Sequence, residues 1–301
     1  MRAVPMLSAG AATLALAGAL AATVYPAPPA GSAPASPPSP GICQSVDELP
    51  MQARPGQESR SGESHEFYFT RVIYSDGGRR GGMGFFGGRG GRGGRGGRWA
   101  TDYPTADRTF TTFIKRLTSL DTCNWEHPVS LADPDLRRFP FIYAVEVGDW
   151  SLTDEELAGL RGFLAAGGFM VIDDFWGTYE WQGFEREMNR ILPGNQIVEI
   201  PMDSPIFNML YQIEKIEQVP NISNARDISI GYPGASTSEG DGIVPHVRGI
   251  YDANGRLSVI INWNTDLGDS WEWADDPYYP LQFSTYAYQL AANMILYSMT
   301  H

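Results

Sequence analysis

Apolar residues along residues 65–301 fall into short continuous runs that alternate with amphipathic segments. The runs at 67–74, 140–147 and 169–172 are rich in β-branched and aromatic residues, which is typical of strands. Unbroken apolarity favours parallel strands that are covered on both faces. Further strands are predicted in "HPVSL" at 127–131, in "QIVEIP" at 196–201 and in a hairpin at 249–264 that turns at Asn254-Gly255.

The segments between these runs place apolar residues three and four positions apart, the spacing of one helix face. The segment "SLTDEELAGLRGFLAAGG" is the best defined, because Thr153 and Glu156 form a capping-box pair and Gly167 ends the helix. Strands that alternate with helices predict an α/β fold with a mostly parallel sheet and helices on both faces. Other helices are predicted at 104–120, 180–194 and 280–300, and at the start of "SPIFNMLYQI", whereas residues 218–249 are expected to be loop-rich.

The N-terminal part of the chain predicts export. Residues 1–21 combine one Arg, an Ala-rich apolar run and small residues, which is the pattern of a signal peptide. An uncleaved membrane anchor is the alternative, and it would be the protein's one contact with a membrane. Residues 22–64 are rich in Pro, Ala and Ser and predict a disordered linker. We therefore expect an exported protein, periplasmic or extracellular, with a single α/β domain at 65–301.

Residues 77–98 form a Gly-rich loop with RGG repeats that we expect to be disordered. Such repeats bind RNA in other settings. The chain as a whole has a formal net charge of −13, although residues 79–98 hold six arginines and no acid. An acidic body repels phosphate, so we interpret the loop as a surface insertion and do not expect nucleic-acid binding. A protein that interacts with partners through this loop stays as an alternative.

The two cysteines, Cys43 and Cys123, form neither a disulfide framework nor a zinc signature. A bridge between them would suit an exported protein, but their spacing alone leaves the pairing open.

Acidic and indole side chains follow several of the predicted strands. In open α/β sheets, ligands collect at the carboxyl ends of the strands. We therefore expect a candidate pocket at this edge, and His246 and Arg248 join it because they lie close together in a loop-rich region. The candidate residues are Asp149, Trp150, Asp173, Asp174, Trp176, Asp203, His246, Arg248, Asp266 and Asp269.

Three chemistries could use such residues. Grouped carboxylates can hold a hard divalent cation, two carboxylates can act as acid and base on a glycosidic bond, and carboxylates beside indoles can bind a sugar or a cation. The structural alternative is that Asp173 or Asp174 caps the helix that follows. Adjacent side chains on a strand point to opposite faces, so we expect one structural Asp and one Asp that faces the pocket.

Activated nucleophiles and cofactor motifs are absent from the sequence. Gly148-Asp149-Trp150 follows the strand at 140–147, where a nucleophile elbow would need Ser or Cys. The four histidines form no ligand motif, and the Gly-rich loop lacks the ending of a phosphate-binding loop. We therefore expect no cofactor, apart from the divalent cation that the carboxylates allow.

Four stretches of the chain carry a family resemblance. They are "DPDLRRFPFIYAVEVGDWSLTDEELAGLRGFLAAGGFMVIDDFWG", "IPMDSPIF", "VPHVRGIYDANGRLSVIINWNTDLGDSWEW" and "NMILYSMTH". Together they resemble the bacterial domain of unknown function 4159, in order and over nearly all of 65–301. The resemblance implies a flavodoxin-like fold of the class I glutamine-amidotransferase type. The family often has His where this chain has Ser204, and the RGG loop enlarges a short connection.

The resemblance implies no reaction, and an amidotransferase would need a Cys at the elbow. Our leading prediction is an exported, non-catalytic domain that binds a small-molecule or protein ligand through its acidic edge. The alternative is a carboxylate- or metal-dependent hydrolase that acts on a carbohydrate-like substrate.

Overall fold

The computed structural model describes Cys43, residues 65–77 and residues 97–301. The predicted signal peptide at 1–21, the linker at 22–64 apart from Cys43, and residues 78–96 of the RGG loop lie outside these described residues. Within the part of the chain that the structure describes, no helix combines the length and the apolarity needed to cross a membrane.

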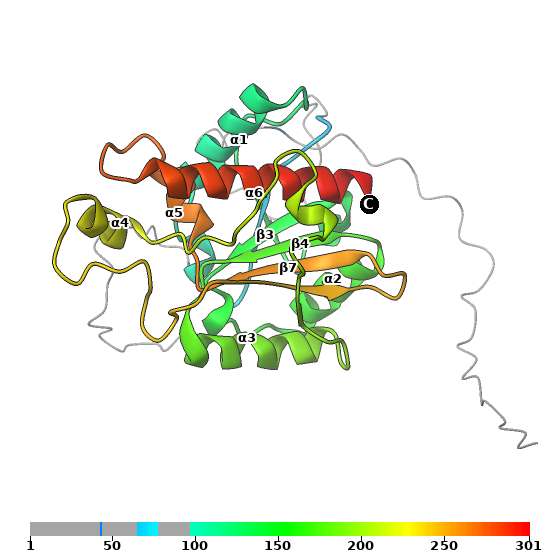
Figure 1. The fold of residues 1–301 in the computed structure, drawn as a ribbon. Helices are drawn as coiled ribbons and strands as arrows, with labels where there is room; N and C mark the ends of the chain where they lie inside the picture. Colours follow the sequence, from blue (N-terminus) through cyan, green and yellow to red (C-terminus); the bar gives the residue numbers. More distant parts are fainter. Residues whose placement is uncertain (1–42, 44–64, 78–96) are drawn as a thin grey trace, which may run out of the picture. The chain divides into compact units, whose positions relative to one another are not determined.

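A seven-stranded sheet forms the centre of the fold (Figure 1). The strand order is β2-β1-β3-β4-β7-β6-β5, and the four pairings that link β2 through to β7 are parallel. The antiparallel pairings join β6 to β7 and β5 to β6. The predicted mostly parallel α/β sheet is therefore confirmed. The strands are β1 (Thr70–Ile73), β2 (His127–Ser130), β3 (Phe141–Val145), β4 (Phe169–Asp173), β5 (Val198–Glu199), β6 (His246–Tyr251) and β7 (Leu257–Trp263).

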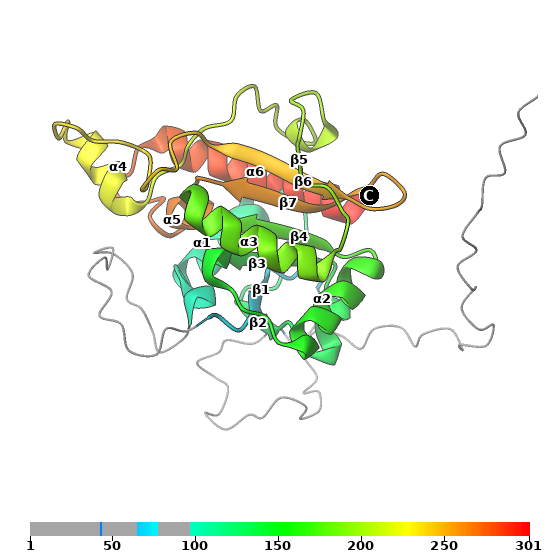
Figure 2. The same cartoon turned by 90° about the horizontal axis from the view of Figure 1, so that it is seen from below.

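Helices cover both faces of the sheet, α1 and α6 on one face and α2 and α3 on the other (Figures 1 and 2). Short 3-10 turns at Arg98–Ala100, Pro134–Arg138, Val147–Asp149 and Pro205–Phe207 connect the elements. The helices are α1 (Thr105–Leu117), α2 (Asp154–Ala165), α3 (Gly177–Ile191), α4 (Ile222–Ser229), α5 (Leu267–Glu272) and α6 (Leu281–Thr300).

The central strand β4 shows why continuous apolarity marked these strands. Phe169 and Val171 pack in the core on the α1 and α6 face. Met170 and Ile172 pack in the core on the α2 and α3 face. Because both faces are buried, the first four positions of the strand are apolar, and the one buried polar residue is Asp173 at its carboxyl end.

Two local predictions are confirmed in detail. The side chain of Thr153 accepts from the Glu156 amide while Glu156 reaches back to the Thr153 amide, so the capping box at α2 is complete. The β6–β7 hairpin turns at Gly255, whose φ of +80° lies in the left-handed region that favours glycine.

Three features differ from the prediction. The strand expected at 196–201 is reduced to β5, which has two exposed residues and occupies the edge of the sheet. Helix α3 begins at Gly177 rather than at 180. The loop-rich stretch at 218–249 contains α4, and α5 follows β7 directly. Both helices are short, at eight and six residues, so their apolar period is too brief to read from the sequence.

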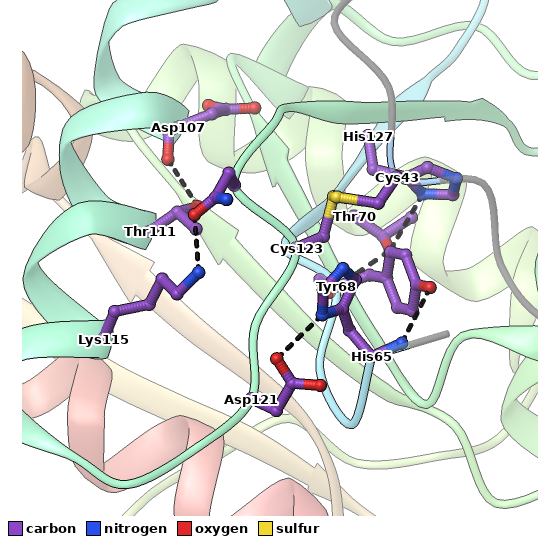
Figure 3. The surroundings of a disulfide bond; sticks show 11 residues. Cys43, His65, Tyr68, Thr70, Asp107, Thr111, Lys115, Asp121, Cys123 and His127 are labelled. Carbon is purple, nitrogen blue, oxygen red and sulfur yellow. Dashed lines mark hydrogen bonds and ion pairs between the residues drawn. A yellow bond between two sulfur atoms is a disulfide. The ribbon is translucent and has the colours of Figure 1, made fainter. Parts of the chain in front are cut away.

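A disulfide joins Cys43 to Cys123, which settles the pairing that the sequence left open (Figure 3). Cys123 lies where the chain passes the start of β1, and its amide donates to the carbonyl of Phe67 at 3.0 Å. Nearby, the side chain of His65 bonds to Asp121 at 2.8 Å. The disulfide therefore attaches Cys43 to the end of the sheet where β1 begins.

Reduction of the disulfide should lower the free energy of unfolding by about 3 kcal/mol, because the bond closes a long loop in the unfolded chain. Urea denaturation with and without reductant measures the change. The double variant Cys43→Ser/Cys123→Ser should show the same loss and should not respond to reductant. Equal midpoints for the oxidised and reduced protein would contradict the expectation.

Candidate functional site

Asp173 ends the central strand β4 and is completely buried. Its Oδ2 atom accepts hydrogen bonds from the Tyr143 hydroxyl at 2.7 Å and from the amides of Leu267 and Gly268 at 3.0 and 3.1 Å. These amides belong to the first turn of α5. Asp173 therefore caps α5 and connects it to β3 and β4.

The first turn of α3 has other partners. The amide of Trp176 donates to Glu180 at 2.6 Å, and the amide of Gly177 donates to Asn264 at 2.8 Å. Thr178 donates to Asp241. The expectation that Asp173 or Asp174 caps the following helix is therefore wrong.

Asp174 follows the strand with a φ of +51°, in the left-handed region. Its Oδ1 accepts from the indole of Trp176 at 3.0 Å, and its amide donates to the carbonyl of Thr265 at 3.2 Å. These bonds place the carboxylate at the carboxyl end of the sheet, beside the chain that leaves β7.

Three carboxylates converge next to Asp173. One oxygen each from Asp102, Asp266 and Asp269 lies within 4.8 Å of the other two. We call these three residues the aspartate cluster. Asp266 and Asp269 were predicted from the sequence, whereas Asp102 was not.

Two of the three carboxylates of the cluster are fixed by the backbone around them. Asp266 Oδ1 accepts from the amide of Asp269 at 2.7 Å, and so caps α5. Asp269 Oδ2 accepts from the amide of Ile222, the first residue of α4, at 2.6 Å. Asp102 Oδ2 is buried and has no hydrogen-bond partner among the described residues.

Gly268 makes room for Asp102. A Cβ at position 268 would lie 2.5 Å from Asp102 Oδ2, closer than any real side chain approaches. Only glycine at this position lets the carboxylate reach the first turn of α5. The first turn of α5 therefore forms one wall of the aspartate cluster.

The cluster concentrates negative charge in a buried place. Burial, followed by the charges of Asp174 and Asp269, raises the pKa of Asp266 well above its usual range. Burial, followed by the charge of Asp269, does the same to the pKa of Asp102. The charge of Arg71 lowers the pKa of Asp102 in part, but Arg71 is itself engaged by buried Asp107. The aspartate cluster therefore lacks a counter-charge of its own.

More acids surround the cluster at the same edge. Burial raises the pKa of Asp173 to about 7, although bonds from Tyr143, Leu267 and Gly268 act in the opposite direction. Burial, followed by the charge of Glu146, raises the pKa of Asp174 well above its usual range. Grouped carboxylate oxygens with little basic compensation are the ligand set that a hard divalent cation prefers.

The other predicted residues are not part of the aspartate cluster. Asp149 pairs with Arg98 at 2.6 Å, and Arg98 also pairs with Glu146. Trp150 and Trp176 are buried, and Trp150 stacks on Phe184 in the core. The predicted pocket therefore does not include these indoles as free surfaces.

Asp203, His246 and Arg248 are also separate from the cluster. Asp203 is exposed. The next residue, Ser204, bonds to Tyr251, which pairs with Leu257 at the start of β7 and so lies at the opposite end of the sheet from the cluster. His246 and Arg248 lie on β6 and share Glu199 as an ion-pair partner.

The position of Asp102 in the topology could have identified it. Asp102 lies in the connection from β1 to α1, and this connection starts at the same carboxyl edge of the sheet as the connections that hold the other candidate residues. The RGG loop separates Asp102 from β1 by many residues, so the sequence does not present it as a residue that follows a strand.

Asp173→Ala should lower the free energy of unfolding by about 3 kcal/mol, because the Tyr143 hydroxyl and two amides would lose their buried acceptor. Chemical denaturation measures this loss. Asp173→Asn keeps an acceptor oxygen and should lose much less, and Asp203→Ala is the exposed control. Equal losses for Asp173→Ala and Asp203→Ala would contradict the assigned role.

Stability in the absence of divalent cations should fall between pH 6.5 and pH 8.5. The folded domain binds protons more tightly than the unfolded chain at Asp173, whose pKa is raised to about 7, and at Asp102, Asp174 and Asp266. Their contribution is therefore present at low pH and is lost as the pH rises through the folded values.

Thermal unfolding in EDTA measures this dependence. His127, whose pKa burial lowers to about 4, acts in the opposite direction but only below pH 6.5. Asp266→Asn should flatten the profile, and a wild-type melting temperature that is constant or rises over this range would contradict the charge assignment.

Comparison with known proteins identifies the family. No match to the chain was found among curated proteins. The model of a family described as a domain of unknown function, DUF4159, matches residues 89–299, which include α1 to α5, all but the last residue of α6 and the whole aspartate cluster. The chain therefore belongs to the DUF4159 family.

Proposed function

We propose that this chain is an exported, non-catalytic domain that binds a ligand or partner through its acidic edge and holds a hard divalent cation in the buried aspartate cluster. One observation carries the proposal. Three buried carboxylates from two separate parts of the chain place an oxygen within 4.8 Å of one another. A divalent cation supplies the counter-charge that this arrangement lacks.

The hydrogen bonds that orient the cluster support a cation, and they include a bond from the Trp273 indole to Asp269 Oδ1 at 3.2 Å. Asp266 and Asp269 use carboxylate oxygens to cap α5 and α4, so the backbone orients both side chains without any ligand. Outer hydrogen bonds of this kind orient the ligands of metal sites. Asp102 Oδ2, which accepts no hydrogen bond from the described residues, would be a direct ligand.

Hydrolysis fits the same residues less well. A glycosidase needs two carboxyl groups that face a sugar across an open site. Asp266 and Asp269 are only 3% and 6% exposed, and Asp173 is occupied by three donors. A small ion fits between such side chains, whereas a sugar ring does not.

The finer fold assignment belongs to the same proposal. The five parallel strands, taken in chain order, follow the pattern 2-1-3-4-5, which is the flavodoxin-like order. This order supports a flavodoxin-like domain of the glutamine-amidotransferase type. The only described cysteines are joined in a disulfide, so none is available as an amidotransferase nucleophile.

Two observations support the proposal that the protein is exported. The first is the signal-like pattern at 1–21. The second is the disulfide between Cys43 and Cys123, because structural disulfides persist in oxidising compartments. Both favour a periplasmic or extracellular location.

Millimolar Ca²⁺ or Mg²⁺ should raise the melting temperature of the mature protein by about 5 °C or more at pH 8. This shift is expected when the cation concentration is roughly 100 times the dissociation constant of the site. The shift should be smaller at pH 6, because protons compete for the same carboxylates. Differential scanning calorimetry against EDTA measures both values.

Asp266→Asn is the decisive variant. Its amide oxygen can still cap α5, but one negative charge is removed, so the melting temperature in EDTA should rise while the response to the cation disappears. Asp203→Asn makes the same chemical change at an exposed position and should keep the wild-type response. A wild-type protein without any shift, or an equal shift in Asp266→Asn, would refute the cation site.

A further inference from the structure

A groove of about 530 Å³ runs between α3 and the outer edge of the sheet, on the face opposite to α5. Trp181, Glu185 and Asn189 line one side and are spaced four residues apart along α3. The connection from α3 to β5 lines the other side with Asn195 and Gln196. The volume lies within the range of small-ligand sites.

Arg248 forms the floor of this groove. Its guanidinium carbon lies 4.5 Å from the ring centre of Trp181 and 4.7 Å from that of Trp263. Its Nε atom donates to Glu199 at 2.6 Å. Two indoles and one carboxylate hold the guanidinium, and only 22% of the side chain is exposed. The floor is therefore rigid before any ligand arrives.

His246 extends the same arrangement. It stacks on Trp263 with ring centres 4.9 Å apart, and its Nδ1 atom lies 2.7 Å from the same oxygen of Glu199. Glu199 thus balances the charge of Arg248 and leaves little net positive charge in the groove.

Several polar groups in the groove have no protein partner. The two terminal nitrogens of Arg248 make no hydrogen bond with any residue that the structure describes. The same is true, within that part of the chain, of the side-chain amides of Asn189, Asn195 and Gln196. An amide offers both donors and an acceptor, whereas guanidinium offers donors only. The groove therefore presents mixed donors and acceptors beside an indole.

We propose that this groove binds a neutral oligosaccharide. Sugar hydroxyls both donate and accept, as the three amides do. The amides lie beside the partly exposed edge of Trp181, whose ring packs on Arg248 and Trp263. An anionic ligand fits less well, because Glu185 and Glu199 border the groove and Arg248 is already paired. This site is independent of the aspartate cluster, which lies on the other face of the sheet.

Isothermal titration of the mature protein with neutral hexasaccharides tests the proposal, using cellohexaose, maltohexaose and hexa-N-acetylchitohexaose as probes and a hexauronate as the anionic comparison. At least one neutral probe should bind. The double variant Asn189→Ala/Gln196→Ala removes two exposed side chains and should weaken that binding at least tenfold without changing the melting temperature. Gln212→Ala, in another surface hollow, should bind like wild type.

Oligosaccharide binding should also persist in EDTA and in the variant Asp266→Asn. A failure of the oligosaccharide proposal can therefore be distinguished from a failure of the cation site. Three results would overturn the proposal: no heat with any neutral probe, full binding by Asn189→Ala/Gln196→Ala, or tighter binding of the hexauronate. Trp181→Ala is a secondary variant, because Trp181 also packs on Phe175 and Phe184.

Discussion

The carboxyl end of the sheet depends on the capping of α5 by the buried carboxylate of Asp173. One oxygen of this side chain receives the Tyr143 hydroxyl from β3 and two amides from the first turn of α5. This contact fixes α5 over the end of β4. Because Asp266 and Asp269 frame the same turn, their carboxylates must point to a common place. The interaction that closes the fold therefore also gathers the negative charge.

Much of the fold could be predicted because its signals are local. Strand β4 and its neighbours are buried on both faces, so apolarity alone marks them, and the capping box of α2 lies within four residues. The missed helices α4 and α5 are too short to show a clear apolar period, at eight and six residues. Each has a local cap, Asn221 for α4 and Asp266 for α5. Each also donates an amide to a distant carboxylate, α5 to Asp173, about 94 positions earlier, and α4 to Asp269, about 47 positions later. The sequence of one segment can show the local cap but not the distant carboxylate.

The candidate site was predicted in part for a related reason. The rule that ligands gather at the carboxyl ends of strands found Asp173, Asp174, Asp266 and Asp269. It does not say on which face of the sheet a side chain lies. Residues of β6 alternate between faces, so His246 and Arg248 join Trp181 on the α3 face, whereas α5 packs with α1 on the other. The sheet thus divides one predicted pocket into two sites.

The two sites differ in how their charges are balanced. Beside α3, Glu199 pairs with both His246 and Arg248, so that groove is neutralised by the protein itself. Beside α5, the carboxylates raise one another's pKa, and the neighbouring Arg71 is held by Asp107. Buried charge without a partner is costly, and it is relieved by protons or by a cation. Changes in divalent-cation concentration should therefore act on the aspartate cluster and leave the groove beside α3 largely unchanged.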